Sequence, residues 1–369
     1  MFKKVSLKLI LPSLLILGIV RCVIHNNISE EYQFVWDISI ENHTGISKDL
    51  HQKDGKHRGM SVFGWQRNHN ESINQLVKNN LEWVAIVPFL YQKTEKTKVV
   101  RLRKEYDNWS RSDSTYLSSV EKIHARKMHV MLKPHLWMNE GWRSNIQMDN
   151  TEEWNVWFES YRKEMVHYAK LANHAKIELF CIGTELKSSL IAQPEKWNTL
   201  IKEIKDVYFG RLTYAANWDG EFNDVKFWDQ MDYIGIQAYF PITNKNNPSL
   251  NEIKKGWKKQ IKLLEALSKK HNKPILFSET GYRSDETATI EPWIWGSALD
   301  IVTNKKSFET QNLAYEALFQ QLWDKDWFAG LYFWQWHVDS VEGSNYEKMD
   351  FTPRFKPAEN TMAKWYGRE

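Results

Sequence analysis

Cysteine is scarce in this sequence, and so is charge of one sign. The 369 residues include only Cys22 and Cys181, which excludes a disulfide framework and any zinc or iron–sulfur site built from cysteines. Fifty Lys and Arg residues face 46 Asp and Glu residues, and no long block of either sign occurs. The net charge of +4 is therefore spread along the chain, and a basic face for nucleic acid is not expected.

Metal-binding and cofactor-binding motifs are also missing. The twelve histidines form no HExxH pattern or clustered ligand spacing, and no glycine-rich dinucleotide fingerprint follows an apolar run. Neither a metal nor a cofactor is therefore expected. Aromatic residues, in contrast, are abundant: 19 Trp, 15 Tyr and 17 Phe make up 14% of the chain. With a hydrophobic fraction of 42%, this composition predicts a globular protein with a large core and many flat, amphipathic side chains to place.

The N-terminus carries a targeting pattern. Three lysines precede an apolar run over residues 9–20, and twelve helical residues span about 18 Å, too little for a bilayer core of roughly 30 Å. A secretory signal over residues 1–22 is therefore expected. Cys22 lies where a bacterial lipobox has its cysteine, but Arg21 stands in place of the small residue. A lipid anchor and a plain signal both remain open, and either places the protein outside the cytoplasm, as a secreted, periplasmic or membrane-anchored protein.

The rest of the chain alternates apolar, β-rich runs with longer amphipathic stretches. Strands are predicted over residues 59–65, 83–91, 129–137, 177–186, 212–218, 233–241, 274–282 and 330–339. Helices are predicted over residues 70–79, 113–126, 152–172, 194–207, 250–271, 309–323 and 357–365, with a short one at 227–231. Eight strands, each followed by a helix or its remnant, predict an α/β fold whose parallel sheet closes into a (β/α)8 TIM barrel. A doubly wound open sheet is the structural alternative.

The domain organisation follows from this alternation. One catalytic domain is expected over residues 57–369. The polar residues 23–56 before it are predicted to form a tether with a single short strand over 32–40.

Two carboxylates stand at the polar ends of predicted strands. Glu185 ends the fourth strand and Glu279 lies near the end of the seventh, and the carboxyl ends of barrel strands surround the active site. Two carboxyls about 5–5.5 Å apart suit retaining glycoside hydrolysis, one as nucleophile and the other as acid and then base. The alternative is a structural ion pair with a nearby Lys or Arg. A glutamate withdrawn from solvent against an arginine would end the catalytic account.

Five segments of the chain resemble glycoside hydrolase family 113. They are RGMSVFGW (58–65), KPHLW (133–137), FCIGTEL (180–186), IGIQAYFP (234–241) and FSETGYRS (277–284). The resemblance implies a (β/α)8 enzyme of the retaining clan A, whose characterised members cleave β-1,4-mannan, with Glu185 as acid/base and Glu279 as nucleophile. Many clan A enzymes carry Asn directly before the acid/base to contact the sugar 2-hydroxyl. Thr184 stands there in this chain, so that contact is unassigned.

Other residues near the strand ends are candidates for the site. Tyr239 is expected either to hydrogen-bond Glu279 and hold it ionised, or to pack at the barrel rim. Candidates for binding sugar hydroxyls or stacking on pyranose rings are Trp65, Lys133, His135, Trp137, Trp142, Asn217, Trp218, Trp295, Trp334 and Trp336, since a Trp ring combines an apolar face with a polar edge. For each tryptophan the alternative is core packing, and for Lys133 it is an ion pair with a carboxylate.

These observations predict a retaining glycoside hydrolase that acts on a polysaccharide or oligosaccharide. The substrate, β-1,4-mannan or a related mannose-containing polysaccharide, is implied by the resemblance alone. A different β-glycan, such as glucan or xylan, is the alternative within the enzyme class. A surface protein that binds carbohydrate without cleaving it is the alternative outside that class, and the presence of both glutamates argues against it.

Overall fold

The computed structural model describes residues 34–65, 70–102, 111–295, 304–338 and 349–369. The unit considered below runs from Trp36 to Glu369. The signal expected over residues 1–22, together with Cys22, lies outside the described residues. No helix in the described ranges has the length and apolar character needed to cross a membrane.

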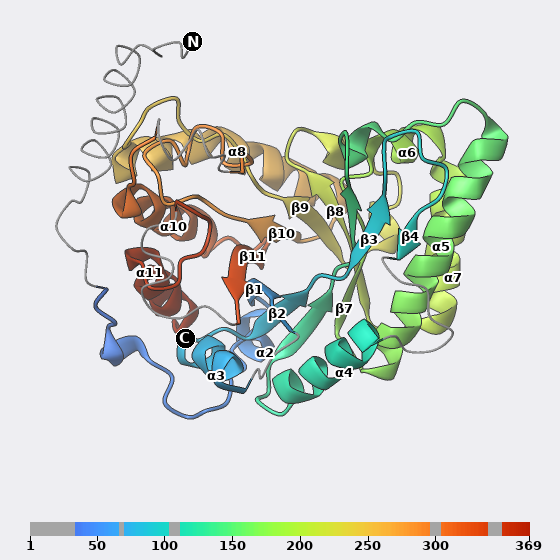
Figure 1. The fold of residues 1–369 in the computed structure, drawn as a ribbon. Helices are drawn as coiled ribbons and strands as arrows, with labels where there is room; N and C mark the ends of the chain where they lie inside the picture. The colour runs from blue at the N-terminus through green and yellow to red at the C-terminus, as the bar shows by residue number, and fades with distance from the viewer. Residues whose placement is uncertain (1–33, 66–69, 103–110, 296–303, 339–348) are drawn as a thin grey trace, which may run out of the picture. The chain divides into compact units, whose positions relative to one another are not determined.

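Eight parallel strands close into a barrel (Figure 1). They are β1 (His57–Phe63), β2 (Trp83–Ile86), β5 (His129–Leu132), β7 (Leu179–Thr184), β8 (Arg211–Asn217), β9 (Tyr233–Gln237), β10 (Ile275–Thr280) and β11 (Phe328–His337). Each strand pairs with the barrel strands before and after it in the chain, and β1 pairs with β11 to close the ring. The expected (β/α)8 barrel is therefore confirmed, and the open sheet is excluded.

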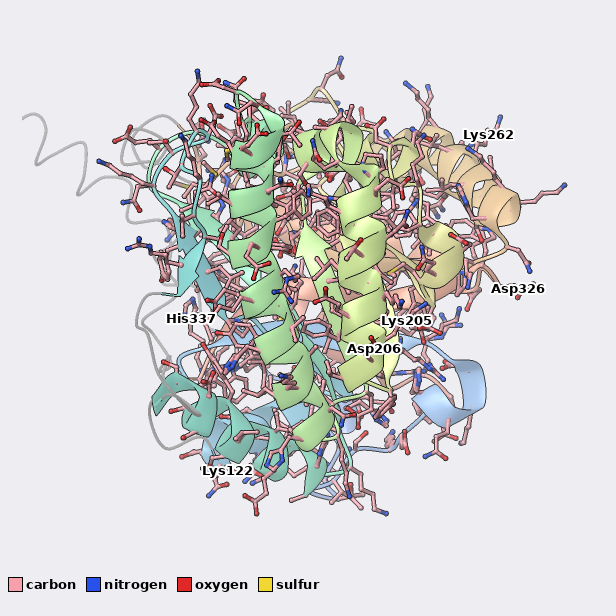
Figure 2. All side chains as sticks on the ribbon, turned by 90° about the vertical axis from the view of Figure 1, so that its right-hand side faces the viewer. Lys122, Lys205, Asp206, Lys262, Asp326 and His337 are labelled. Atoms are coloured by element: carbon pink, nitrogen blue, oxygen red, sulfur yellow. The ribbon has the colours of Figure 1, made fainter. Side chains whose placement is uncertain are left out.

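Helices follow most of the strands and cover the outside of the barrel. Their bounds are α2 (His51–Asp54), α3 (Asn70–Lys78), α4 (Arg111–His124), α5 (Thr151–His174), α6 (Lys187–Ala192), α7 (Pro194–Val207), α8 (Leu250–His271), α10 (Phe308–Leu322) and α11 (Pro357–Tyr366). The described residues also contain the 3-10 turns η2 (Ile38–Ile40), η3 (Arg143–Asn145), η4 (Glu221–Asn223) and η5 (Trp228–Gln230). The helices α5 and α7 run side by side (Figure 2).

Local sequence explains where the best predicted helices begin. The helix α8 starts with a capping box, in which the Ser249 side chain accepts from the Glu252 amide and the Glu252 side chain accepts from the Ser249 amide. The helix α5 begins after Asn150, whose side chain accepts from the Glu153 amide. Each cap satisfies an amide that has no partner within its helix. The helix α8 begins at the predicted residue 250, whereas α5 begins at Thr151, one residue before its predicted start.

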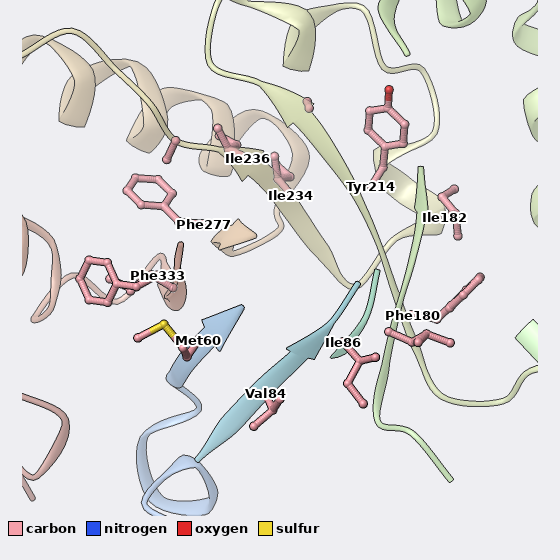
Figure 3. Packing of buried hydrophobic residues seen from close by; sticks show 14 of the residues in the cluster. Met60, Val84, Ile86, Phe180, Ile182, Tyr214, Ile234, Ile236, Phe277 and Phe333 are labelled. Atoms are coloured by element: carbon pink, nitrogen blue, oxygen red, sulfur yellow. The ribbon is translucent and has the colours of Figure 1, made fainter. Parts of the chain in front are cut away.

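The core forms two layers because successive strand residues point to opposite faces. One cluster draws on six strands and fills the barrel interior: Trp83, Ala85, Met131, Leu179, Tyr233, Leu276, Ala329 and Tyr332. The other cluster lies between the strands and the helices and includes Val84, Ile86, Phe180, Ile182 and Phe277 (Figure 3). Within β2 the two clusters alternate residue by residue. Both faces are buried, which is why the strand sequences read as continuous apolar runs.

Replacing Trp257 with alanine is expected to lower the free energy of unfolding by about 3–5 kcal/mol. Trp257 is fully buried on α8, and its ring stacks on Phe277 of β10 at a centroid distance of 6.1 Å. The truncation leaves a cavity between helix and sheet that the rigid barrel cannot refill. Denaturant titration measures the loss. The control is Leu263→Ala on the same helix, where a side chain 40% exposed should cost no more than about 0.5 kcal/mol. Equal losses in the two variants would contradict this account.

Two predicted strands are each broken by a proline. The run predicted over 83–91 becomes β2 and β3 (Phe89–Gln92), and the run over 129–137 becomes β5 and β6 (His135–Met138). Pro88 and Pro134 lie in the gaps between these strands, and proline has no backbone N–H to donate to a hydrogen bond between strands. The strands β3 and β6 instead join β4 (Arg101–Leu102) in a separate three-stranded sheet. The expectation of two continuous strands is therefore wrong.

The prediction of a tether over residues 23–56 is wrong for its described part, residues 34–56. The predicted strand is absent from the described residues 34–40, where the 3-10 turn η2 forms instead. Further on, the amides of Leu50 and His51 donate to the Glu82 carboxylate at 2.5 and 2.9 Å. This segment packs on the barrel through isolated backbone hydrogen bonds, which leave no periodic pattern in the sequence.

Candidate active site

The two glutamates lie at the carboxyl ends of the strands that the sequence indicated. Glu185 directly follows β7, the fourth barrel strand, and Glu279 is the penultimate residue of β10, the seventh. Only β8 and β9 separate these strands around the barrel. Glu185 is 4% exposed and Glu279 is 5% exposed, so each charge depends on its protein partners.

Both carboxylate oxygens of Glu279 are held. The Tyr239 hydroxyl donates to Oε1 at 2.6 Å, and the Lys133 ammonium lies 2.5 Å from Oε2. Burial raises the pKa of Tyr239 well above its ordinary value, so the phenol stays a donor. The fully buried Lys133 also donates to Gln237 Oε1 at 2.9 Å. The expected Tyr239 hydrogen bond is present, whereas Lys133 is sealed against the carboxylate, and the expectation that it binds sugar hydroxyls is wrong.

Replacing Lys133 with methionine is expected to lower the free energy of unfolding at neutral pH by about 3–5 kcal/mol, because Glu279 would remain as an uncompensated buried charge. The double variant Lys133→Met, Glu279→Gln removes both charges and should regain most of this loss. Denaturant titrations of the wild type, both single variants and the double variant give the coupling between the two sites. Additive losses would contradict the strength assigned to this pair.

Glu185 is presented by an unusual backbone conformation. Its φ of +53° lies in the left-handed region, where non-glycine residues are uncommon and cluster at functional sites. Its amide donates to the Ala215 carbonyl at 2.9 Å. The Asn217 amide group donates to Oε1 at 2.8 Å, and Arg143 forms an ion pair with Oε2. Burial raises the pKa of Glu185; the Arg143 charge opposes this and the Glu279 charge adds to it.

A third carboxyl, Glu221, supports the Glu185 side of the site and was missed by the sequence analysis. It lies fully buried on η4. Its oxygens accept from the Tyr214 hydroxyl at 2.6 Å and from the backbone amide of Asn217 at 2.7 Å. The Tyr214 oxygen in turn accepts from the Leu186 amide at 2.7 Å. Burial raises the pKa of Glu221 to about 8. Glu221 therefore supports Leu186, which follows Glu185, and Asn217, which hydrogen-bonds Glu185, although it lies in a turn whose sequence carries no motif.

Both glutamates form the ion pairs that were the structural alternative. Glu185, in addition, is 4% exposed and paired with Arg143, the observation stated above as one that would end the catalytic account. That criterion was too strict, because buried catalytic carboxylates also need charged partners. The location of both glutamates at the carboxyl ends of barrel strands and the effect of the Glu279 charge on the pKa of Glu185 favour a functional site. Arg143, however, opposes protonation of Glu185, and any catalytic role must account for it.

Several of the expected aromatic side chains are open to solvent. Trp137, Trp142 and Trp295 are 51%, 42% and 59% exposed. Trp218, which is partly buried, stacks on Trp293 with ring centroids 4.7 Å apart. Exposed tryptophans are costly to leave in water, and such flat faces suit the apolar sides of sugar rings.

Other expected stacking residues are buried. Trp336 is fully buried, with the Arg354 guanidinium 5.0 Å from its ring centre. Trp65 is 5% exposed and donates its indole N–H to the Val62 carbonyl at 2.8 Å. The expectation that these two rings stack on sugars is therefore wrong, because neither face is accessible. Trp334 is also 5% exposed, packed edge-on against Trp295 with ring centroids 5.8 Å apart, and supports that exposed ring.

His135 combines burial with unused hydrogen-bonding capacity. It opens β6 just after Pro134 and is 7% exposed, and neither ring nitrogen has a hydrogen-bond partner among the described residues. Burial, followed by the Arg143 and Lys133 charges, lowers the pKa of His135 well below its ordinary value. The ring is therefore neutral at pH 7 and offers one donor and one acceptor. A polar ligand is the natural partner for such a group.

Comparison with known proteins identifies the family. The model of glycoside hydrolase family 113 matches residues 60–355. The chain belongs to glycoside hydrolase family 113. The family 113 chain is therefore a glycoside hydrolase, and its substrate is a polysaccharide or oligosaccharide. No curated protein matches it.

Solved structures with the same fold include other family 113 enzymes. One, a β-mannanase from Alicyclobacillus acidocaldarius in complex with ManMIm, shares 26% sequence identity over 85% of this chain and 97% of its own, with a TM-score of 0.74. A second, described as a complex of a family 113 β-1,4-mannanase, shares 25% identity over 84% of this chain and 98% of its own, with a TM-score of 0.73. A β-glucuronidase from Ruminococcus gnavus, 12% identical with a TM-score of 0.51, covers 78% of this chain and 45% of its own and shares the barrel fold alone.

Proposed function

We propose that this family 113 enzyme is a retaining β-mannanase that uses Glu279 as nucleophile and Glu185 as acid and base. The observation that carries the proposal is the position of the two carboxyls at the carboxyl ends of barrel strands: Glu185 directly follows β7 and Glu279 lies near the end of β10. The charge of Glu279 also raises the pKa of Glu185. Both features support double displacement by two glutamates.

In the first step Glu279 attacks the anomeric carbon and a C–O bond forms between them. The bond from that carbon to the leaving oxygen breaks, and the Glu185 proton passes to this oxygen. In the second step Glu185 takes a proton from water, whose oxygen displaces Glu279 and restores the original configuration. The Tyr239 and Lys133 contacts hold the Glu279 oxygens in place for the attack, and Asn217 orients Glu185.

The raised pKa of Glu185 suits its role as an acid. Because burial favours the neutral carboxyl, Glu185 keeps its proton at a higher pH than an ordinary glutamate. Rising pH removes this proton, so kcat/KM should fall on the alkaline side. A mechanism that needs one ionised and one protonated carboxyl also loses activity on the acid side, which gives a bell-shaped profile.

The substrate assignment rests on similarity to two β-mannanases, on exposed tryptophan rings and on a buried histidine with unused hydrogen-bonding capacity. The two family 113 structures described above are β-mannanases at 25–26% identity. The exposed Trp137, Trp142 and Trp295 offer stacking faces, and the unpartnered nitrogens of His135 offer hydrogen bonds to hydroxyls. We also propose that the enzyme acts outside the cytoplasm, on the strength of the N-terminal signal pattern in the sequence.

The test is hydrolysis of β-mannan, glucomannan, xylan and cellulose oligosaccharides, with product anomers followed by NMR. The expected result is release of β-anomers first, from mannan and glucomannan. Preferential cleavage of xylan or cellulose would replace the substrate but keep the mechanism, and initial release of the α-anomer would overturn the retaining mechanism. Binding to mannan without cleavage would favour a carbohydrate-binding protein.

A further inference from the structure

We propose that Arg143 is a positioning residue that sets the acidity of Glu185 in both steps of the reaction. This inference rests on the proposed function and concerns the residue whose charge, at first sight, argues against it. Arg143 lies on η3 in the segment between β6 and α5, and Glu185 follows β7. The pair therefore joins two segments that meet only in the folded barrel.

The turn that carries Arg143 is fastened to the segment that carries Glu185. The Ser144 hydroxyl donates to the Glu185 carbonyl at 2.9 Å. The Ser188 hydroxyl, on α6, donates to the Ile146 carbonyl at the end of the turn. Two side-chain hydrogen bonds in opposite directions thus hold the η3 segment against Glu185 and α6. The Arg143–Glu185 ion pair is part of this built contact and not a chance meeting of long surface side chains.

The guanidinium itself is held on two sides. Its carbon lies 4.3 Å from the centre of the exposed Trp142 ring, and one of its terminal nitrogens pairs with Glu185. The Arg143 side chain is only 13% exposed, and its Nε is buried without a hydrogen-bond partner among the described residues. The positive charge of Arg143 is therefore placed to act on Glu185, with the Trp142 ring beside the guanidinium.

The charged and titratable groups that act on Glu185 come from several elements. They are Arg143 on η3, Lys133 after β5, Glu279 on β10, Glu221 on η4 and Tyr239 after β9. Burial is the largest influence and raises the pKa of Glu185, and the Arg143 charge is the largest influence that lowers it. Removing Arg143 should therefore move this pKa further up.

The two steps make opposite demands on Glu185. The first needs a carboxyl that gives its proton to the leaving oxygen, and the second needs a carboxylate that takes a proton from water. Burial without Arg143 would favour the protonated carboxyl that the first step needs and would lower the fraction of carboxylate that is available for the second. An arginine on the carboxylate oxygen stabilises the anion left after the first step. Burial and Arg143 together allow Glu185 to act as an acid in the first step and as a base in the second.

The decisive variant is Arg143→Gln, which removes the charge and keeps a polar side chain. We expect the alkaline limb of kcat/KM to move to higher pH, because Glu185 retains its proton longer. On an activated aryl β-mannoside, whose second step limits turnover, the acid limb of kcat should also move to higher pH. Arg143→Lys keeps the charge and should restore both limbs toward the wild type.

The control is Arg162→Gln, which removes an equal charge from an outer ion pair with Glu159 and Glu203 and should leave both limbs in place.

A purely structural Arg143 would change stability or KM but leave the pH limbs where they are, and this result would overturn the proposal. Ser144→Ala tests the same idea if Arg143→Gln does not fold, because it keeps the charge but frees the turn from Glu185. Ser144→Ala should move the limbs of both pH profiles in the same direction as Arg143→Gln, but by a smaller amount. Limbs that coincide with those of the wild type would again overturn the proposal. A wild type inactive on every mannan and aryl mannoside would instead refute the proposed function.

Discussion

Replacing Glu279 with alanine is expected to lower kcat on mannan by about 10⁴-fold or more, since the proposed covalent intermediate forms on its carboxylate. Glu279 is the carboxylate on which Tyr239 and Lys133 converge. The alanine also leaves room for a small anion. Adding azide to this variant with an activated aryl β-mannoside should restore turnover and give the α-mannosyl azide, because azide attacks from the face that Glu279 occupied.

The matched control for Glu279 is Glu265→Ala. Glu265 is an exposed residue on α8, on the outer side of the barrel, and its removal should leave kcat unchanged. NMR of the azide product is the deciding measurement. A β-azide from the Glu279 variant, or hydrolysis equal to the wild type, would remove Glu279 from the nucleophile role.

Replacing Glu185 with alanine is expected to lower kcat/KM on mannan by roughly 10²–10⁴-fold, the usual contribution of a positioned general acid. The loss should depend on the leaving group. An aryl β-mannoside with a very acidic phenol needs no proton in the first step, so its glycosyl-enzyme should form almost normally and then accumulate. A burst of phenol followed by slow turnover is the expected time course.

The pH profile distinguishes this role from a structural one. The alkaline limb that depends on the raised pKa of Glu185 should disappear in Glu185→Ala, and the profile should become flat on that side. Glu195→Ala, at an exposed position on α7, serves as the control and should keep the bell shape. An alkaline limb that persists in Glu185→Ala would assign it to another group, and the buried Glu221, with a pKa of about 8, would be the first to examine.

Elements whose signals are local were predicted well from the sequence. The helix α8 was expected over residues 250–271 and has those bounds, because its capping box and apolar spacing lie within one segment. The catalytic candidates were found because a charged residue at the end of an apolar strand is conspicuous. The parallel barrel followed from the strand count, since eight alternating units have few other ways to bury both faces of every strand.

Features that depend on distant contacts were missed or misread. The sequence shows Lys133 and Glu279 only as residues 146 positions apart, so nothing local distinguishes a sugar-binding lysine from one sealed in an ion pair. Trp336 and Trp295 look alike in sequence, yet one is fully buried and the other is 59% exposed. Arg143 and Glu221 carried no signal, because their importance comes from side chains that other segments bring to them.

The sequence by itself determined the kind of protein this is: an eight-unit barrel with a glutamate at the ends of its fourth and seventh strands. Short-range patterns encode strands, helices and caps, and the closure of the barrel then brings those strand ends together. Only the tertiary structure decided how each side chain is used. Burial and the charge of neighbours depend on every segment that packs around a group, and these govern its pKa, its accessibility and its partners.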